Sequence, residues 1–531
     1  MRRQKFDLVI VGGGITGAGV AREAASRGMS VALVEASDFA SGTSSRSSKM
    51  IHGGVRYLEN LEFGLVFEAL SERKILFDIA PHLVHPLRFV MPVYDWSRVG
   101  MFKLSLGMWL YDVLSLFEAP ETHLRMDQDQ TRDRLPLLNT SGLVGSFAFY
   151  DAYMDDDRLA IETLRSASQM GAVIANYTRV ESVKYHDQKI SAMICRDEIT
   201  GEMFELSGRH FVGSVGPWTD IFGKSILNDW SRILRPTKGI HVTLDKSRLP
   251  LRDAVVMADD RKNRIVFGMP RREMIVIGTT DTDFSGDPAS VHSDSQDIEY
   301  LLSLCTEYFP GANLKRQDII SSYAGVRPLV HDGSATEGKT SREHKIWYDS
   351  RGITFVAGGK YTTYRHMSEQ IVKSALETFT PEERARFAKS STKTPLNPRV
   401  TTESLRRALA HVHEWARESG YSEAEVQTLV ERHGEEAEEL LVRGRKDRFR
   451  NAWEMEAFHA IQNTMCFHLD DFMIRRSPLF LSKADHGQSY VRGICDVFAQ
   501  YLNWDEAERS HELQRYQKHS DLELAWKNTV G

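Results

Sequence analysis

The chain has 531 residues, of which 41% are hydrophobic and 26% are charged, and this length allows two or three domains with substantial cores. The formal net charge of -6 at pH 7 gives no sign of a basic surface for nucleic acid, which is therefore not expected as a partner. The four cysteines lie far apart in the sequence and form no CxxC pair, so we predict a reducing compartment, no disulfide framework and no metal site.

The N-terminal segment has the pattern of a dinucleotide-binding βαβ unit. A β-prone run at 6–11 precedes a GxGxxG motif, a helix-compatible stretch continues to residue 27, and a second β-prone run occupies 31–35. Glu35 ends the second run, where a carboxylate accepts hydrogen bonds from ribose hydroxyls. The alternative is a glycine-rich turn with a surface glutamate. The predicted contacts to the phosphates are Gly12, Gly14, Ile15, Thr16 and Gly17.

Three later segments favour FAD over NAD as the nucleotide. Residues 41–49, SGTSSRSSK, are basic and rich in hydroxyls, which suits a buried pyrophosphate and the edge of a flavin. Glycine-bearing turns follow β-prone runs at 212–218 and 356–363, and the second leads into a helix whose N–H groups would face a ligand. A nucleotide contacted from both ends of a long chain fits FAD. The predicted contacts here are Thr43, Ser44, Ser45, Ser47, Ser48, Gly216, Gly359, Lys360, Tyr361 and Thr362.

Residues 51–57, IHGGVRY, place a histidine, an arginine and a tyrosine beside two glycines. These polar side chains are costly to bury, and adjacent glycines weaken both helix and strand, so a surface loop is the simplest interpretation. The position directly after the nucleotide-binding pattern is the argument for a functional role instead.

The middle of the chain mixes helices and strands, whereas the last part is helical. We predict helices at 61–83 and 155–170. The β-prone runs lie at 87–93, 209–215, 234–244 and 274–279. From about residue 380 the sequence is rich in Glu, Arg, Ala and Leu at helical spacing, which predicts a separate α-helical domain. Two prolines within 389–399 indicate its linker.

Two segments bear on membrane attachment and on location in the cell. The most apolar stretch, 99–117, is interrupted by Lys103 and Asp112, so it is not a spanning helix. It is either a core helix or a helix in a membrane interface, with Trp109 and Tyr111 at headgroup depth. The N-terminus lacks the apolar region and cleavage site of a signal peptide, so a cytoplasmic location is expected.

Several motifs, in the same order, resemble the FAD-dependent glycerol-3-phosphate dehydrogenases. They are GTSSRSSKMIHGGVRYLE from residue 42, GVRPL from 325, SREH from 341, GGKYTTYR from 358 and DDFMIRR from 470. The resemblance implies an α/β plus α fold, with a glutathione-reductase-like FAD domain of the D-amino-acid-oxidase type, a β-rich substrate domain and a C-terminal helical domain. The predicted boundaries are 1–85 with 150–222 and 350–380 for FAD, 86–149 with 223–349 for substrate, and 381–531 for the helical domain.

The resemblance also implies an activity, the oxidation of sn-glycerol 3-phosphate to dihydroxyacetone phosphate with electrons passed to quinone at the membrane. His52 is the candidate proton acceptor and Arg327 the candidate stabiliser of the reacting oxygen. A histidine that only hydrogen-bonds backbone near the flavin is the alternative for His52. Gly53 and Gly54 would let the backbone pass close to the flavin ring. The candidate ligands of the substrate phosphate are Arg56, Tyr57, Arg342 and Lys360.

Three other functions remain open from the sequence. A glycerol-3-phosphate oxidase would use the same site and pass electrons to oxygen, but the inserted segment of such oxidases is not evident. An amine or amino-acid oxidase would need one carboxylate-binding arginine rather than several phosphate-suited cations. A flavin-binding sensor without turnover is the third. We expect peripheral contact with the inner face of the cell membrane, and both a monomer and a homodimer fit the sequence.

Overall fold

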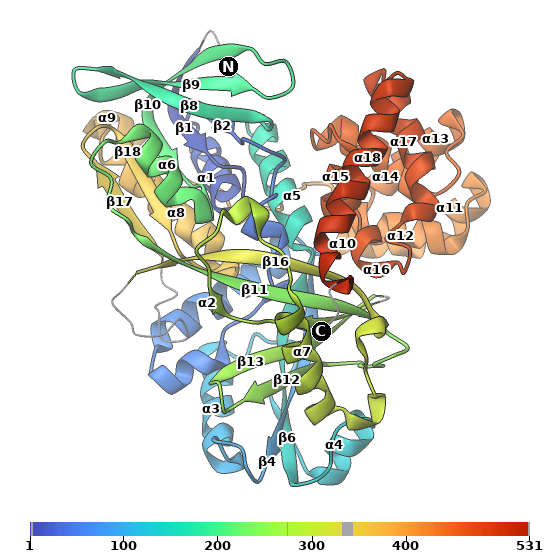
Figure 1. Ribbon diagram of the computed structural model, residues 1–531. Helices are drawn as coiled ribbons and strands as arrows, with labels where there is room; N and C mark the ends of the chain where they lie inside the picture. The colour runs from blue at the N-terminus through green and yellow to red at the C-terminus, as the bar shows by residue number, and fades with distance from the viewer. Residues whose placement is uncertain (2–3, 273, 332–343, 529–531) are drawn as a thin grey trace.

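The computed structural model describes residues 1, 4–272, 274–331 and 344–528. Two β-sheets lie one above the other, and a domain of helices packs beside them (Figure 1). This arrangement confirms the predicted fold class. Each sheet takes strands from distant parts of the chain, so neither sheet corresponds to one continuous stretch of sequence.

The first sheet is mainly parallel and is built around β1. Its strands follow in the order β17 (Lys345–Asp349), β18 (Ile353–Ala357), β10 (Met203–Gly213), β1 (Lys5–Val11), β2 (Val31–Val34) and β7 (Val173–Ala175). β1 is paired in parallel with β2 and β10, so the carboxyl ends of these strands meet at one edge. Ligands of open α/β sheets bind at that edge. β8 (Thr178–His186) and β9 (Lys189–Asp197) extend the sheet from β10.

Helices cover this sheet and form its core. The helices concerned are α1 (Ile15–Ser26), α5 (Asp156–Gln169), α6 (Thr219–Ile226) and α8 (Tyr364–Leu376). Small residues such as Ala18 and Ala21 let α1 pack closely against Leu8 and Ile10 of β1, and all four are fully buried. The predicted βαβ unit and the predicted helix at 155–170 are confirmed.

The second sheet is mixed and larger. Its main path is β15 (Thr282–Asp283), β11 (Leu234–Asp245), β14 (Met274–Gly278), β13 (Arg264–Arg271), β12 (Ala254–Asp259), β4 (Val84–Tyr94), β6 (Leu143–Met154) and β3 (Met50–Ile51). β16 (Ile319–Val330) pairs with β11, and β5 (Leu124–Met126) pairs with β6. β11 and β16 run antiparallel with Thr237 opposite Arg327, and this register fixes where Arg327 leaves the sheet.

Helices also accompany the second sheet. These are α2 (Phe63–Ile79), α3 (Met101–Leu114), α4 (Gln128–Arg134) and α7 (Ser295–Tyr308). The domain boundaries themselves stay a prediction. β17 precedes the predicted boundary at residue 350, yet it pairs with β18 of the first sheet. The sheet to which a strand belongs is decided by strand pairing and not by composition.

The C-terminal part is helical, as predicted. After α9 (Pro381–Arg386) it contains α10 (Thr402–Ala410), α11 (Val412–Ser419), α12 (Glu423–His433), α13 (Glu436–Asp447), α14 (Ala452–Asn463), α15 (Leu469–Asp471), α16 (Leu479–Ser482), α17 (Gln488–Leu502) and α18 (Glu506–Glu523). These helices enclose a core of their own. The chain end returns to the second sheet, where Trp526 Nε1 donates to Ser322 Oγ at 2.8 Å. Among the described residues, no helix combines the length and apolarity needed to cross a membrane.

Candidate active site

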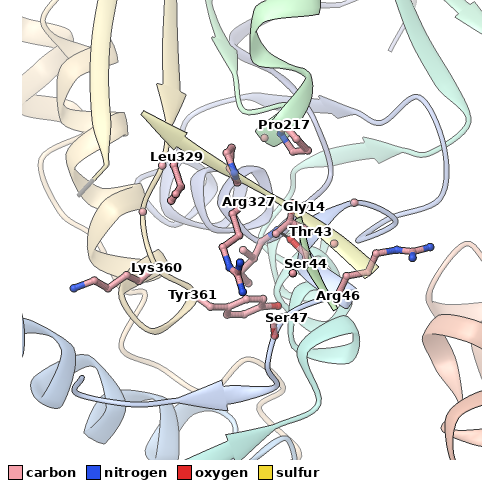
Figure 2. A pocket seen from close by; sticks show the side chains of 18 of the residues that line it. Gly14, Thr43, Ser44, Arg46, Ser47, Pro217, Arg327, Leu329, Lys360 and Tyr361 are labelled. Atoms are coloured by element: carbon pink, nitrogen blue, oxygen red, sulfur yellow. Dashed lines mark hydrogen bonds between the residues drawn. The ribbon is translucent and has the colours of Figure 1, made fainter. Parts of the chain in front are cut away.

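A cavity of about 1460 Å³ lies between the two sheets, where the carboxyl ends of β1, β10 and β18 face β11 and β16. Figure 2 shows Thr43, Ser44 and Ser47 in the lining of this cavity, together with Arg327 of β16. Most of the predicted site residues line this one cavity. Those that do are Gly12, Gly14, Ile15, Thr16, Glu35, Thr43, Ser44, Ser47, Ser48, His52, Tyr57, Gly216, Arg327, Gly359, Lys360, Tyr361 and Thr362.

The glycine turn opens helix α1 toward the cavity. Gly12 adopts a positive φ of 108°, and a Cβ atom there would lie 2.5 Å from the Ser214 carbonyl oxygen, so only glycine fits. A Cβ on Gly17 would overlap the Gly12 carbonyl oxygen. The helix begins at Ile15, whose N–H donates to Ser44 Oγ at 2.9 Å. The turn therefore presents the positive end of a helix dipole to a ligand phosphate.

Glu35 closes this end of the cavity. Its carboxylate accepts hydrogen bonds from the Gly13 N–H at 2.7 Å and the Ser37 N–H at 2.9 Å. Burial raises the pKa of Glu35, while these two hydrogen bonds act in the opposite direction. A carboxylate oxygen has two lone pairs, so both oxygens retain capacity for ribose hydroxyls.

The hydroxyl-rich run is held by long-range contacts. Ser47 Oγ donates to Asp156 Oδ2 at 2.7 Å, and Asp156 also forms a buried ion pair with Lys49. Ser48 Oγ lies 2.9 Å from His241 Nε2. These bonds hold the loop between β2 and β3 at the edge of the cavity.

Cationic and aromatic groups converge on the opposite wall. Arg327 donates to Asp281 Oδ1 at 2.9 Å and to Thr279 Oγ1 at 2.9 Å, which holds its guanidinium at the cavity surface. Lys360 Nζ lies 3.8 Å from the centre of the Tyr57 ring, a cation–π contact. His52 is fixed through its backbone, because its N–H donates to Thr362 Oγ1 at 3.2 Å. A cavity with a dinucleotide turn at one end thus carries cations and an imidazole at the other.

Comparison with known proteins agrees with this site. A family model described as FAD dependent oxidoreductase matches residues 7–365, and one described as the C-terminal domain of alpha-glycerophosphate oxidase matches residues 402–509. Aerobic glycerol-3-phosphate dehydrogenases from Staphylococcus saprophyticus and Staphylococcus haemolyticus are both 33% identical to this chain. The first alignment covers 97% of this chain and 94% of the relative, and the second 96% and 93%.

Solved structures indicate the same family. The glycerol-3-phosphate dehydrogenase from Bacillus halodurans, complexed with FAD, superposes with a TM-score of 0.81 at 26% identity, over 100% of this chain and 97% of that one. The chain belongs to the FAD-dependent glycerol-3-phosphate dehydrogenase family. An L-alpha-glycerophosphate oxidase from Mycoplasma pneumoniae shares only the fold, with a TM-score of 0.56 at 16% identity, over 71% of this chain and 94% of that one.

FAD is the cofactor of this family member, and the residues present fit it. The close approach at Gly12 and the N-terminus of α1 suit a pyrophosphate, and Glu35 suits a ribose. The hydroxyls of the Thr43–Ser48 run and the turn at Gly216 extend this lining toward the second sheet. The individual cofactor contacts remain predictions.

The structure separates the two adjacent glycines of the 51–57 stretch. Gly53 is buried behind the cavity wall, where its N–H donates to Tyr111 Oη at 3.0 Å and Asp151 Oδ1 at 3.2 Å. Gly54 lines the cavity instead, with a φ of 77°. Gly17 and Ser45 likewise lie outside the lining. Gly17 allows close packing of α1, and Ser45 Oγ donates to the Gly42 carbonyl at 3.4 Å.

Two predicted phosphate ligands cannot be placed. Arg342 lies outside the described residues, and only the backbone of Arg56 is described, in the short helix η2 (Val55–Asn60). Both therefore stay predictions.

Two further residues of the site lie in segments whose sequence fits a purely structural role. Asp281 reads as part of an acidic turn, yet it pairs with Arg327 in the cavity wall. His241 reads as part of a kinked strand, yet it lines the cavity and stacks on Tyr323 at 4.8 Å between ring centres. Burial, with Arg327 and Lys49 as smaller contributions, lowers the pKa of His241 well below its ordinary value, so this imidazole is neutral. Both residues reach the cavity because of the register of β11 and β16, and the sequence alone does not predict that register.

Proposed function

We propose that this protein oxidises sn-glycerol 3-phosphate to dihydroxyacetone phosphate and passes the electrons to a membrane quinone. The observation that carries the proposal is that His52, Arg327 and Lys360 line the same cavity as the glycine turn. Relatives that are named aerobic glycerol-3-phosphate dehydrogenases support the choice of substrate.

The residues of the cavity divide the chemistry between them. When bound, FAD supplies the acceptor for the hydride that leaves C2. His52 takes the proton of the C2 hydroxyl, because an imidazole titrates near neutral pH. Arg327 donates hydrogen bonds to the same oxygen as it becomes a carbonyl, and Asp281 holds that guanidinium in place. The oxygen charge is thus met by a cation that is already oriented.

The phosphate requires a second set of charges. Lys360 and the Tyr57 hydroxyl lie together on one side of the cavity and are suited to a dianion. Arg56 and Arg342 complete the predicted set. Because a substrate without the phosphate would form no ion pair with these charges, we expect selection for a phosphorylated alcohol over glycerol.

An oxidase that reduces oxygen is the alternative within the same site. The family model that matches residues 402–509 is described from an oxidase, so this likeness does not separate the two acceptors. The deciding test is anaerobic addition of sn-glycerol 3-phosphate to the FAD-loaded protein, followed by reoxidation with a soluble quinone or with oxygen.

We expect the flavin absorbance to bleach and a quinone to restore it faster than oxygen does. Stoichiometric peroxide with no rate increase from quinone would overturn the acceptor assignment and favour the oxidase. Flavin that stays oxidised would overturn the activity itself and favour a sensor that binds FAD without turnover.

Helix α3 is the proposed contact with the inner face of the membrane. Leu104, Met108 and Tyr111 are buried against the second sheet. The opposite stripe is exposed, with Phe102 at 81% and Trp109 at 57% of full exposure. Leu106, Val113, Leu116 and Phe117 extend this exposed stripe, and Leu61, Phe63 and Phe67 add to it from neighbouring segments. A helix with one face in the core and an apolar face outside can pack in the core and also contact a membrane, which supports this proposal.

Charges on the exposed stripe should release the protein from lipid. We expect Phe102→Glu with Trp109→Glu to weaken binding to anionic vesicles by on the order of 100-fold, because each large apolar side chain contributes roughly 1.5–3 kcal/mol when it leaves water. Sedimentation with vesicles measures the effect. Val442→Glu, an exposed apolar position on α13, is the matched control. Vesicle binding that the double variant leaves unchanged would exclude α3 as the contact.

A further inference from the structure

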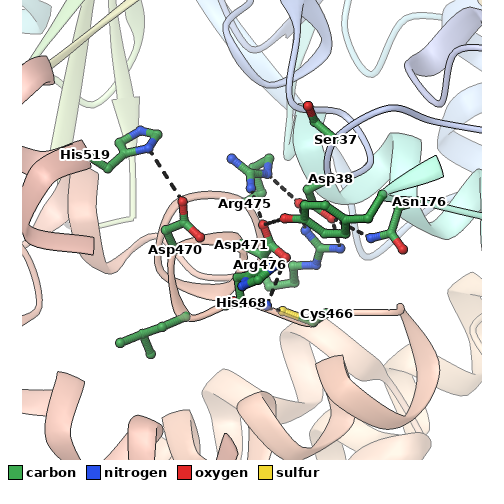
Figure 3. Close-up of polar contacts among 12 residues, drawn as sticks. Ser37, Asp38, Asn176, Cys466, His468, Asp470, Asp471, Arg475, Arg476 and His519 are labelled. Carbon is green, nitrogen blue, oxygen red and sulfur yellow. Dashed lines mark hydrogen bonds and ion pairs between the residues drawn. The ribbon is translucent and has the colours of Figure 1, made fainter. Parts of the chain in front are cut away.

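A buried cluster of ionised side chains joins the C-terminal domain to the cofactor domain (Figure 3). Asp38, in the loop after β2, accepts from Arg475 Nε at 2.5 Å and from Arg476 Nη2 at 2.8 Å. Arg475 and Arg476 end the π-helical turn η9 (Phe472–Arg476) in the DDFMIRR motif. Asp38 is only 1% exposed, and both arginines are also buried. The contact therefore excludes water and connects two distant parts of the chain.

The second partner of Arg475 extends the cluster. Arg475 Nη2 donates to Asp471 Oδ1 at 2.7 Å, and the same oxygen accepts from Tyr177 Oη at 2.7 Å. Asn176 Nδ2 donates to Asp38 Oδ1 at 3.2 Å and to the Met465 carbonyl at 2.9 Å. Two cofactor-domain segments, the loop at Asp38 and the turn at 176–177, are thus fixed to the same helical turn.

Both of these segments continue directly into the wall of the cavity. Glu35, Ala36 and Ser37 line it, and so do residues 178–181. They are also tied to each other, because the Tyr177 N–H donates to the Ser37 carbonyl at 3.0 Å and the Thr178 N–H to the Glu35 carbonyl at 2.7 Å. Asp38, Asn176 and Tyr177 therefore hold the wall from behind, with their side chains directed toward the helical domain.

Ionic interactions keep Asp38 charged. Burial by itself would raise the pKa of Asp38, but Arg476 and Arg475 outweigh it and lower that pKa. Removing one partner of such a buried group leaves an uncompensated charge, which moves or admits water. Because Glu35 lies three residues from Asp38 along the chain, a shift of this loop displaces the carboxylate that faces the cavity.

We infer that Arg475 and Arg476 are positioning residues for the adenosine end of FAD, so that the C-terminal helical domain forms part of the cofactor site. The inference rests on the proposed contact between Glu35 and the ribose. Loss of the cluster then weakens the binding of FAD. The chemistry at His52 and Arg327, on the far side of the cavity, is preserved once FAD is bound.

The test compares FAD affinity in full-length variants. Arg476→Met removes the two hydrogen bonds to Asp38, Arg476→Lys keeps the charge but not the paired geometry, and Tyr177→Phe removes one hydrogen bond to Asp471. The dissociation constant is obtained from the FAD fluorescence released when the purified, FAD-loaded protein is diluted. The control is Glu436→Gln, which disrupts another ion pair between the same two domains, with Arg165 of α5 at 2.7 Å.

We expect the FAD dissociation constant to rise by about 10–100-fold in Arg476→Met, because a displaced loop weakens the contact between Glu35 and the ribose. Arg476→Lys and Tyr177→Phe should give smaller increases, and Glu436→Gln should stay close to the parent protein. At saturating FAD, the kcat and KM of Arg476→Met should match the parent, which a general loss of folding would not allow.

An unchanged FAD dissociation constant in Arg476→Met, or an equal rise in Glu436→Gln, would overturn the inference. If Arg476→Met does not fold, the ranking of Arg476→Lys and Tyr177→Phe against Glu436→Gln decides in the same way. The affinity measurement contains no glycerol 3-phosphate. A protein that binds FAD in this pattern but is not reduced by the substrate would therefore contradict the proposed function alone.

Discussion

Replacing His52 with asparagine is expected to slow the reduction of FAD by sn-glycerol 3-phosphate by about 100- to 10,000-fold, the usual contribution of a positioned general base. The amide has a similar shape but cannot accept the hydroxyl proton. His52 lines the cavity, and its backbone is held by Thr362, so the substitution should leave the fold and the bound FAD in place. Anaerobic stopped-flow measurement of flavin bleaching gives the rate.

The alternative role for His52 predicts a different outcome. A histidine that only supports the backbone would leave flavin reduction close to the parent rate, with FAD still bound. The pH dependence adds a second readout. If His52 is the base, the parent rate falls in acid, because a protonated ring cannot accept a proton, and this limb disappears in His52→Asn.

Replacing Arg327 with methionine is expected to lower kcat/KM by roughly 100- to 1000-fold, the range found when one donor to a developing oxygen charge is removed. The guanidinium is held by Asp281 and Thr279 before substrate arrives, so little reorganisation is needed during the reaction. Methionine keeps most of the length of the side chain and removes the charge. Steady-state kinetics with a soluble quinone measure the change.

The matched control for Arg327 is Arg235→Met. Arg235 pairs with Asp283 at 2.8 Å from β11 of the same sheet, but that ion pair lies outside the cavity. We expect at most a small effect there, because exposed ion pairs contribute little. Equal losses in the two variants would mean that Arg327 acts through the stability of the sheet and not on the substrate.

The sequence determined the features whose signals are local. The glycine turn, the helix after it and Glu35 are specified by neighbouring residues, because a φ of 108° at Gly12 and the packing of Gly17 on the turn need glycine whatever the rest of the chain does. The helical C-terminal part follows from composition and spacing in the same way. Motifs in a fixed order then identified the family.

Tertiary structure alone decided which side chains meet. Within IHGGVRY, the sequence offers two equivalent glycines, but packing against Tyr111 places Gly53 behind the wall and leaves Gly54 at the cavity. Within 99–117, hydropathy does not separate buried Met108 from exposed Trp109, which differ only in the face of α3 they occupy. Both choices depend on where distant elements pack.

The same reason applies to the longest connections. Asp281 reaches Arg327 through the register of β11 with β15 and β16, and Asp38 reaches Arg476 across most of the chain. A charged residue in a sequence gives no sign of whether its partner is water or a residue hundreds of positions away. That partner is selected by the packing of whole domains, since a buried charge is tolerated only where folding brings its counter-charge to it.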